Sequence, residues 1–280
     1  MTGSGIRMTL GALVGFGSAM ALLAPAVQAM PDPAPRGAQY VSLGDSYVAA
    51  GSLTTSTAAG CSQAADNVGH LISARLRPVS FGDWACSGAD TDDFTTVTAM
   101  GPQLRGLTGD TEFVTISIGG NDEDLFGTLL ANCLASTNCT PAVHRAANAK
   151  VDRLGPALDR VYAQVKHRAP KAQVVVIGYP RLLPDDVRGC FAEIYPGPGA
   201  VAVANDVQRR LNEQIAESAD RAGFTAVFPD AAARHTMCAP DGQRYVALTG
   251  IGPGDAGTPV HPTLLGRREI AKLAAAQFSR

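Results

Sequence analysis

The sequence lacks an excess of charge of either sign. Its 280 residues include 23 Lys and Arg against 25 Asp and Glu, so the charges nearly cancel. No basic stripe interleaved with aromatic residues is present, which makes a nucleic acid an unsuitable partner. The same balance gives no support for an acidic substrate or for a polybasic segment that binds a membrane surface. The function must therefore be sought in local motifs.

Several metal, cofactor and hydrolase motifs are also missing. There is no Cys-x-x-Cys pair and no His-x-x-x-His helix face, so a zinc site is disfavoured. Asp90, Asp92 and Asp93 form an acidic cluster, which we interpret as a helix start rather than as a calcium site. Residues 252–257 match Gly-x-Gly-x-x-Gly but follow no convincing strand, which argues against a dinucleotide. The Gly-x-Ser-x-Gly elbow is absent, which argues against the α/β-hydrolase fold. We expect no metal and no cofactor.

The first 29 residues differ in composition from the rest of the chain. Arg7 precedes an apolar run from Met8 to Leu23, and small residues at Val27 and Ala29 flank a cleavage site. This pattern predicts a secretory signal peptide, residues 1–29, cleaved near Ala29. Glycines interrupt the short run, which disfavours an uncleaved membrane anchor. We expect residues 30–280 to form a secreted single domain that acts as a monomer and is not inserted in a membrane.

Six cysteines remain in this exported part of the chain, an even number that favours disulfides over catalytic thiols. Their spacing alone leaves fifteen pairings open. Pairing in sequence order is the arrangement we favour, and its middle pair has the best support because it closes a small loop. The favoured pairs are Cys61–Cys86, Cys133–Cys139 and Cys190–Cys238.

Strand and helix patterns alternate along the chain without internal repeats. This alternation predicts a three-layer α/β/α domain with a parallel sheet. The expected strands are 39–43, 79–86, 112–118, 172–178 and 224–228. The expected helices are 67–76, one beginning at Asp122, a long one around 151–165, one around 203–215, and a last one from Pro262 to about Phe278. The expected long loops are 123–140, 180–200 and 229–257.

The first three expected strands end in glycine-bearing turns. These turns are Gly44-Asp45-Ser46, Ser87-Gly88-Ala89 and Gly119-Gly120-Asn121. The carboxyl ends of parallel strands share one edge of a sheet, where open α/β folds place their ligands. We therefore expect the three turns to meet there.

These turns contain the components of an acyl-transfer site. A serine hydroxyl needs a base to become a nucleophile, and His261 is the candidate base for Ser46, with His235 as a weaker rival. The developing oxyanion needs fixed donors. The backbone N–H groups of Ser46 and Gly88 and the side-chain amide of Asn121 are the candidates.

Together these motifs resemble a known family. The Gly44-Asp45-Ser46 turn, Gly88, the Gly119-Gly120-Asn121-Asp122 turn and His261-Pro262 resemble the four motif blocks of the SGNH (GDSL) hydrolases, in the same order. The cysteine layout and the signal peptide resemble the secreted actinobacterial esterases and lipases of that superfamily. The resemblance implies a flavodoxin-like fold with a five-stranded parallel sheet and ester hydrolysis through an acyl-serine. It also supports the sequential disulfides.

One position departs from the family pattern. An Asp often precedes the histidine by three residues and orients its ring, but this chain has Thr258 there. We expect the main-chain carbonyl of Thr258, or one beside it, to orient His261 in a Ser–His dyad. Asp255 is the alternative carboxylate.

The resemblance implies a lipase or carboxylesterase, and a triacylglycerol lipase is one of the activities that it includes. A carbohydrate deacetylase, a phospholipase, and an exported binding module with a vestigial site are the alternatives. An apolar acyl site is expected from loop residues that could equally lie in the core: Leu125, Phe126, Leu129, Leu182, Leu183 and Tyr195.

Overall fold

The computed structural model describes residues 34–57, 60–98, 101–190, 197–230, 232–252 and 257–278. The expected signal peptide and its cleavage site near Ala29 lie outside these residues. The same is true of Tyr195, one of the expected acyl-site residues, and of Asp255, the alternative carboxylate.

A sheet of parallel strands forms the centre of the described domain. The strand order is β2-β1-β3-β4-β5, and every neighbouring pair is parallel. This is the flavodoxin-like order of doubly wound sheets. The predicted α/β fold with a five-stranded parallel sheet is therefore confirmed. The strands are β1 Tyr40–Gly44, β2 Phe81–Asp83, β3 Phe113–Ser117, β4 Gln173–Ile177 and β5 Thr225–Val227.

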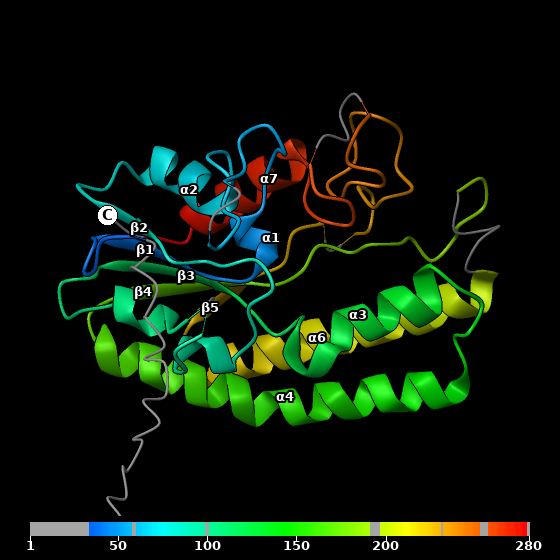
Figure 1. Ribbon diagram of the computed structural model, residues 1–280, viewed down its shortest axis with the longest axis horizontal. Coiled ribbons are helices and arrows are strands. Elements are labelled where there is room, and N and C mark those ends of the chain that lie inside the picture. Colours follow the sequence, from blue (N-terminus) through cyan, green and yellow to red (C-terminus); the bar gives the residue numbers. More distant parts are fainter. Residues whose placement is uncertain are drawn as a thin grey trace, which may run out of the picture. The chain divides into compact units, whose positions relative to one another are not determined.

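Helices cover both faces of the sheet (Figure 1). The longer ones are α2 Val68–Leu76, α4 Pro141–Arg168, α6 Gly197–Ala222 and α7 Leu264–Ala275. The α2 and α7 helices pack together on one face, and α4 and α6 pack together on the other. The shorter segments are α1 Ser46–Ala49, α3 Leu125–Leu129, the 3-10 turns Asp92–Phe94, Gln103–Gly106 and Asp122–Asp124, and a π-helical turn Leu130–Leu134. None of the described helices has the length and apolar character needed to cross a bilayer.

The strands are buried on both faces because successive side chains point to opposite helix layers. Val41 and Leu43 belong to the core beneath α4, where they cluster with Leu158. Tyr40, which alternates with them, clusters with Ile72 of α2 on the other face. This two-sided burial accounts for the continuous apolar strand patterns in the sequence.

Most predicted boundaries differ from the structure by a few residues, and three of the differences have local explanations or consequences. Pro262 was expected to open the last helix, but the helix begins at Leu264 and Thr263 is its N-cap. The Thr263 hydroxyl accepts the N–H of Gly266 at 3.1 Å, which satisfies a donor of the first turn. The expected loop 180–200 is shorter, since α6 begins at Gly197. The β2 strand is also shorter than 79–86, and it pairs only with β1 at the edge of the sheet.

The six cysteines are paired in sequence order, as favoured from the sequence. The disulfides are Cys61–Cys86, Cys133–Cys139 and Cys190–Cys238. Cys61–Cys86 joins the loop after α1 to the segment that follows β2, close to the predicted oxyanion donor Gly88.

Candidate active site

Ser46 lies at the carboxyl end of β1, where a glycine turns the chain sharply. Gly44 has φ of 138°, and a Cβ at this position would lie 2.2 Å from the carbonyl oxygen of Ser117 on β3. Only glycine fits between these strands. The buried Gln103 side chain holds the same residue, accepting the Gly44 N–H at 2.7 Å and donating to its carbonyl at 2.9 Å. The turn therefore places Ser46 as the first residue of α1.

The structure brings His261 to Ser46 from the far end of the chain. Its Nε2 lies 2.7 Å from the Ser46 Oγ, and its Nδ1 lies 2.8 Å from the carbonyl oxygen of Pro259. A carbonyl can only accept, so Nδ1 carries the proton and Nε2 can accept one from the hydroxyl. Burial lowers the pKa of His261 below its usual value, although the hydrogen bond to Pro259 opposes this effect. The imidazole is thus kept neutral, with Nε2 directed at the Ser46 hydroxyl.

The acceptor for His261 Nδ1 is the carbonyl of Pro259, beside Thr258, which is the second of the two main-chain acceptors expected from the sequence. Instead of contacting the ring, the Thr258 carbonyl accepts the backbone N–H of His261 at 3.1 Å, which closes the turn that contains both residues. This turn directs the next carbonyl, that of Pro259, towards Nδ1. The rival base His235 is engaged elsewhere: its Nδ1 bonds the Gln243 carbonyl at 2.7 Å and its ring stacks on Tyr245.

The predicted oxyanion donors lie on the turns that follow β1, β2 and β3. Among the described residues, the backbone N–H groups of Ser46 and Gly88 have no hydrogen-bond acceptor. Gly88 has φ of 86°, a left-handed conformation that favours glycine. The Asn121 amide uses one N–H to bond the Ala89 carbonyl at 2.9 Å, which leaves its second N–H available.

The turns after β2 and β3 are bonded to each other. Besides the bond from Asn121 to Ala89, the Asp122 carboxylate accepts the backbone N–H of Thr91 at 3.2 Å and also its hydroxyl. Burial raises the pKa of Asp122 to about 6. These bonds fix the turn that contains Asn121 to the segment that directly follows Gly88, and fixed donors are what an oxyanion site requires.

The acidic cluster after Gly88 is occupied by local backbone contacts. Asp90 accepts the N–H of Asp92 at 2.9 Å, and Asp93 accepts the N–H of Asp90 at 3.1 Å. The cluster opens a 3-10 turn, Asp92–Phe94. Within the described residues, no group of acidic, His or Cys side chains is arranged to hold a metal ion.

Tyr179 is a site residue that the sequence analysis missed. Its hydroxyl donates to the buried carboxylate of Asp45 and accepts the N–H of Gly120 at 2.8 Å. The other Asp45 oxygen accepts the N–H of Tyr47 at 2.9 Å. Burial raises the pKa of Asp45 to about 7. Asp45 therefore braces the turn and does not contact His261. Because Tyr179 follows the β4 strand as Ser46 follows β1, the strand-end rule could have identified it.

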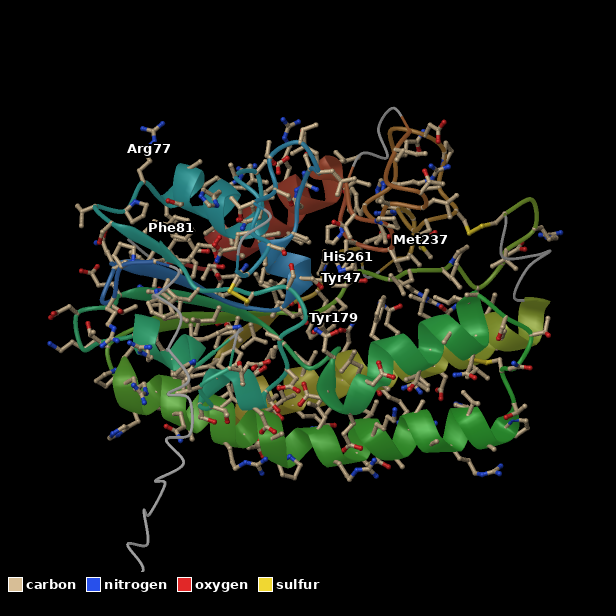
Figure 2. All side chains as sticks on the ribbon, in the orientation of Figure 1. Tyr47, Arg77, Phe81, Tyr179, Met237 and His261 are labelled. Carbon is tan, nitrogen blue, oxygen red and sulfur yellow. A yellow bond between two sulfur atoms is a disulfide. The ribbon has the colours of Figure 1, made fainter. Side chains whose placement is uncertain are left out.

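Tyr47 is a second missed residue. It connects α1 to the loop that carries Val260 and His261, which we call the histidine loop. Figure 2 shows Tyr47, Tyr179 and His261 together, and the Tyr47 ring centroid lies 4.9 Å from that of His261. The Tyr47 hydroxyl donates to the carbonyl of Val260 at 2.7 Å. Val260 has φ of 62°, an unfavourable left-handed conformation for a β-branched residue. Tyr47 thus holds a strained residue directly before His261.

An apolar pocket opens beside Ser46 and lies between the sheet edge, α3 and α6. It encloses about 660 Å³, including its open mouth. Of the expected acyl-site residues, Leu125, Phe126, Leu129 and Leu182 line it. Leu183 does not line it, because its side chain is fully buried in the core that includes Met237.

Comparison with known proteins gives a consistent result. Residues 42–268 match the model of the GDSL-like Lipase/Acylhydrolase family. Lipase 2 of Streptomyces coelicolor is 31% identical over 91% of this chain and 90% of its own length. The crystal structure of phospholipase A1 from Streptomyces albidoflavus NA297 is 30% identical, with a TM-score of 0.67 over 85% of this chain and 98% of that one. The extracellular lipase of Streptomyces rimosus is 28% identical, with a TM-score of 0.69 over 85% and 97% of the two chains. The chain therefore belongs to the GDSL-like lipase/acylhydrolase family of carboxylic ester hydrolases.

Proposed function

We propose that this protein is a secreted serine hydrolase of lipid esters, in which Ser46 and His261 act as a dyad. The observation that carries the proposal is the hydrogen-bond chain from Ser46 Oγ to His261 Nε2, and from His261 Nδ1 to the Pro259 carbonyl. A carbonyl in place of a carboxylate still fixes the tautomer that a general base needs. The relation to the extracellular lipase of Streptomyces rimosus supports secretion.

The reaction would proceed in two half-reactions of the same kind. As Ser46 Oγ attacks the ester carbonyl carbon, His261 Nε2 takes the hydroxyl proton and the carbonyl oxygen becomes an oxyanion. The N–H groups of Ser46, Gly88 and Asn121 would stabilise that charge. The C–O bond to the alcohol then breaks, and the proton on Nε2 passes to the departing oxygen. Water attacks the acyl-serine with the same base, and the acid and free Ser46 are released.

The apolar pocket supports an aliphatic acyl group. Its walls include Leu125, Phe126 and Leu211, and it opens directly onto Ser46 and Asn121. Transfer of each CH₂ group from water to such surroundings is favourable by about 0.8 kcal/mol. Medium-chain esters should therefore be better substrates than acetates. A phospholipase is the second candidate, favoured by the similarity to phospholipase A1 of Streptomyces albidoflavus NA297.

The direct test is hydrolysis of a p-nitrophenyl ester by the mature chain and by two variants. Ser46→Ala and His261→Ala should each lower kcat by about four orders of magnitude or more, because nucleophile and base act as a unit. His235→Gln is the matched control and should leave kcat unchanged, since His235 contacts Gln243 and Tyr245 instead. Equal rates for the wild type and Ser46→Ala would disprove the proposal and favour a binding module.

A further inference from the structure

Ser46 lies at the boundary of two different hollows. One is the apolar pocket. The other, which we call the hydroxyl cleft, encloses about 960 Å³ including its open mouth and is lined also by Ala50, Leu53 and His261. It contains the hydroxyl side chains of Ser56, Thr57, Ser62, Ser87 and Thr258. The lining of the hydroxyl cleft is therefore more polar than that of the apolar pocket on the other side of Ser46, although Ala50 and Leu53 also contribute to it.

The position of His261 determines which half of an ester enters which hollow. The proton on Nε2 must reach the oxygen of the departing alcohol, so that oxygen has to lie beside His261. His261 lines the hydroxyl cleft and is not among the residues that line the apolar pocket, whereas Asn121 lines the apolar pocket. The acyl chain therefore belongs in the apolar pocket, and the alcohol belongs in the hydroxyl cleft.

The walls of the hydroxyl cleft suit an uncharged polar group. Among the described residues, the hydroxyls of Ser56, Ser62 and Thr258 have no protein hydrogen-bond partner, so they are available to a ligand. His261 is the only ionisable side chain among the described residues that line the cleft. A phosphate or an ammonium group would find no counter-charge there, while the hydroxyls of a polyol would find donors and acceptors.

A disulfide and hydrogen bonds anchor the loop that forms one wall of the cleft, which reduces the ordering that binding would require. The Cys61–Cys86 disulfide closes its loop onto the segment before Gly88. Behind the loop, the Asp66 carboxylate accepts the N–H of Ser52 at 2.9 Å and the hydroxyl of Thr55 at 2.7 Å. The fully buried guanidinium of Arg267 bonds the same carboxylate at 2.7 Å.

We infer that the hydroxyl cleft binds the alcohol half of the substrate and selects an uncharged, hydroxyl-bearing alcohol such as glycerol or a sugar. This inference rests on the proposed function, since it concerns the leaving group of the same ester. It makes Ser56 and Ser62 determinants of alcohol specificity, outside the groups that perform the chemistry.

The test compares esters that share one acyl chain and differ only in the alcohol. Ethyl octanoate, glycerol mono-octanoate and octanoyl glycerophosphocholine are used below their critical micelle concentrations. A neutral hydrogen bond contributes a factor of about five to kcat/KM. With two or more such bonds, the wild type should hydrolyse the glycerol ester at least about tenfold better than the ethyl ester. The glycerophosphocholine ester should not exceed the ethyl ester.

Ser56→Ala/Ser62→Ala should lose the preference for the glycerol ester while keeping kcat/KM on ethyl octanoate. Ser73→Ala on α2, which lines neither hollow, is the matched control and should keep the preference. An unchanged preference in the double variant, or a wild type that favours the glycerophosphocholine ester, would overturn the inference. If the Ser46→Ala variant hydrolysed all three esters at the wild-type rates, the proposed function itself would be overturned.

Discussion

Replacing Tyr47 with Phe removes one hydroxyl and leaves the aromatic ring in place. The lost group donates to the Val260 carbonyl at 2.7 Å, whereas the ring keeps its contacts with His261 and Tyr179, both at 4.9 Å between centroids. The ring also lines the apolar pocket, so the acyl site should be preserved. The perturbation therefore concerns only the tether between α1 and the histidine loop.

The expected magnitude follows from the hydrogen bond and from the backbone strain that it opposes. An unsatisfied carbonyl costs about 1–3 kcal/mol. Val260, with φ of 62°, occupies a conformation that costs about 1–2 kcal/mol for a residue with a side chain. Without the tether, the loop should leave its present geometry, and misplacement of His261 should raise the barrier by about 1.4 kcal/mol. An activation barrier raised by this amount corresponds to a tenfold fall in kcat. KM should change little.

The assay is the measurement of kcat and KM on p-nitrophenyl octanoate, together with urea unfolding. Tyr162→Phe is the matched control, because the buried Tyr162 hydroxyl has no partner among the described residues, and its removal should not lower kcat. Val260→Gly in the Tyr47→Phe background should recover part of the lost kcat, since glycine adopts this conformation readily. A kcat for Tyr47→Phe within twofold of the wild type, or no recovery with glycine, would refute a positioning role.

Two further predictions concern pH. Because burial lowers the pKa of His261, the acid limb of kcat/KM should have its midpoint below the ordinary value of about 6.5, and activity should fall as pH drops through it. A midpoint above 6.5 would indicate a carboxylate beside the ring, as the Asp255 alternative requires. Burial also raises the pKa of Asp83 to about 7, so the folded state keeps a proton that the unfolded state loses near pH 4. Stability should therefore fall as pH rises from about 4 to about 7, and Asp83→Asn should reduce this fall in urea unfolding. If the fall in unfolding free energy between about pH 4 and about pH 7 were unchanged in Asp83→Asn, the raised pKa of Asp83 would not be its cause.

Much of the fold is predictable because it depends on local patterns. The strand at Phe113–Ser117 and the helix face around Leu158 follow from apolar spacing, and the predicted elements occur in the predicted order. The boundaries were less accurate, since they depend on single contacts. The Thr263 hydroxyl caps α7 in place of Pro262, and the edge strand β2 pairs on one side only.

For the candidate site, local patterns in the chain specify the residue types and their order. Glycine turns at the ends of parallel strands are a local signal, and their common edge follows from the parallel arrangement, so Ser46, Gly88 and Asn121 could be predicted together. His261 could be predicted as their partner because serine chemistry requires a base.

The groups that hold these residues in place follow from long-range contacts in the folded chain. The Pro259 carbonyl, rather than that of Thr258, accepts the His261 proton because the turn closes on the Thr258 oxygen. Tyr47 contacts Val260, which is more than two hundred residues away in the sequence. Tyr179, which follows β4, bonds both Asp45 after β1 and Gly120 after β3. Such contacts connect residues that are distant in the chain, and no local spacing encodes them. They exist only once the sheet has brought its strand ends together.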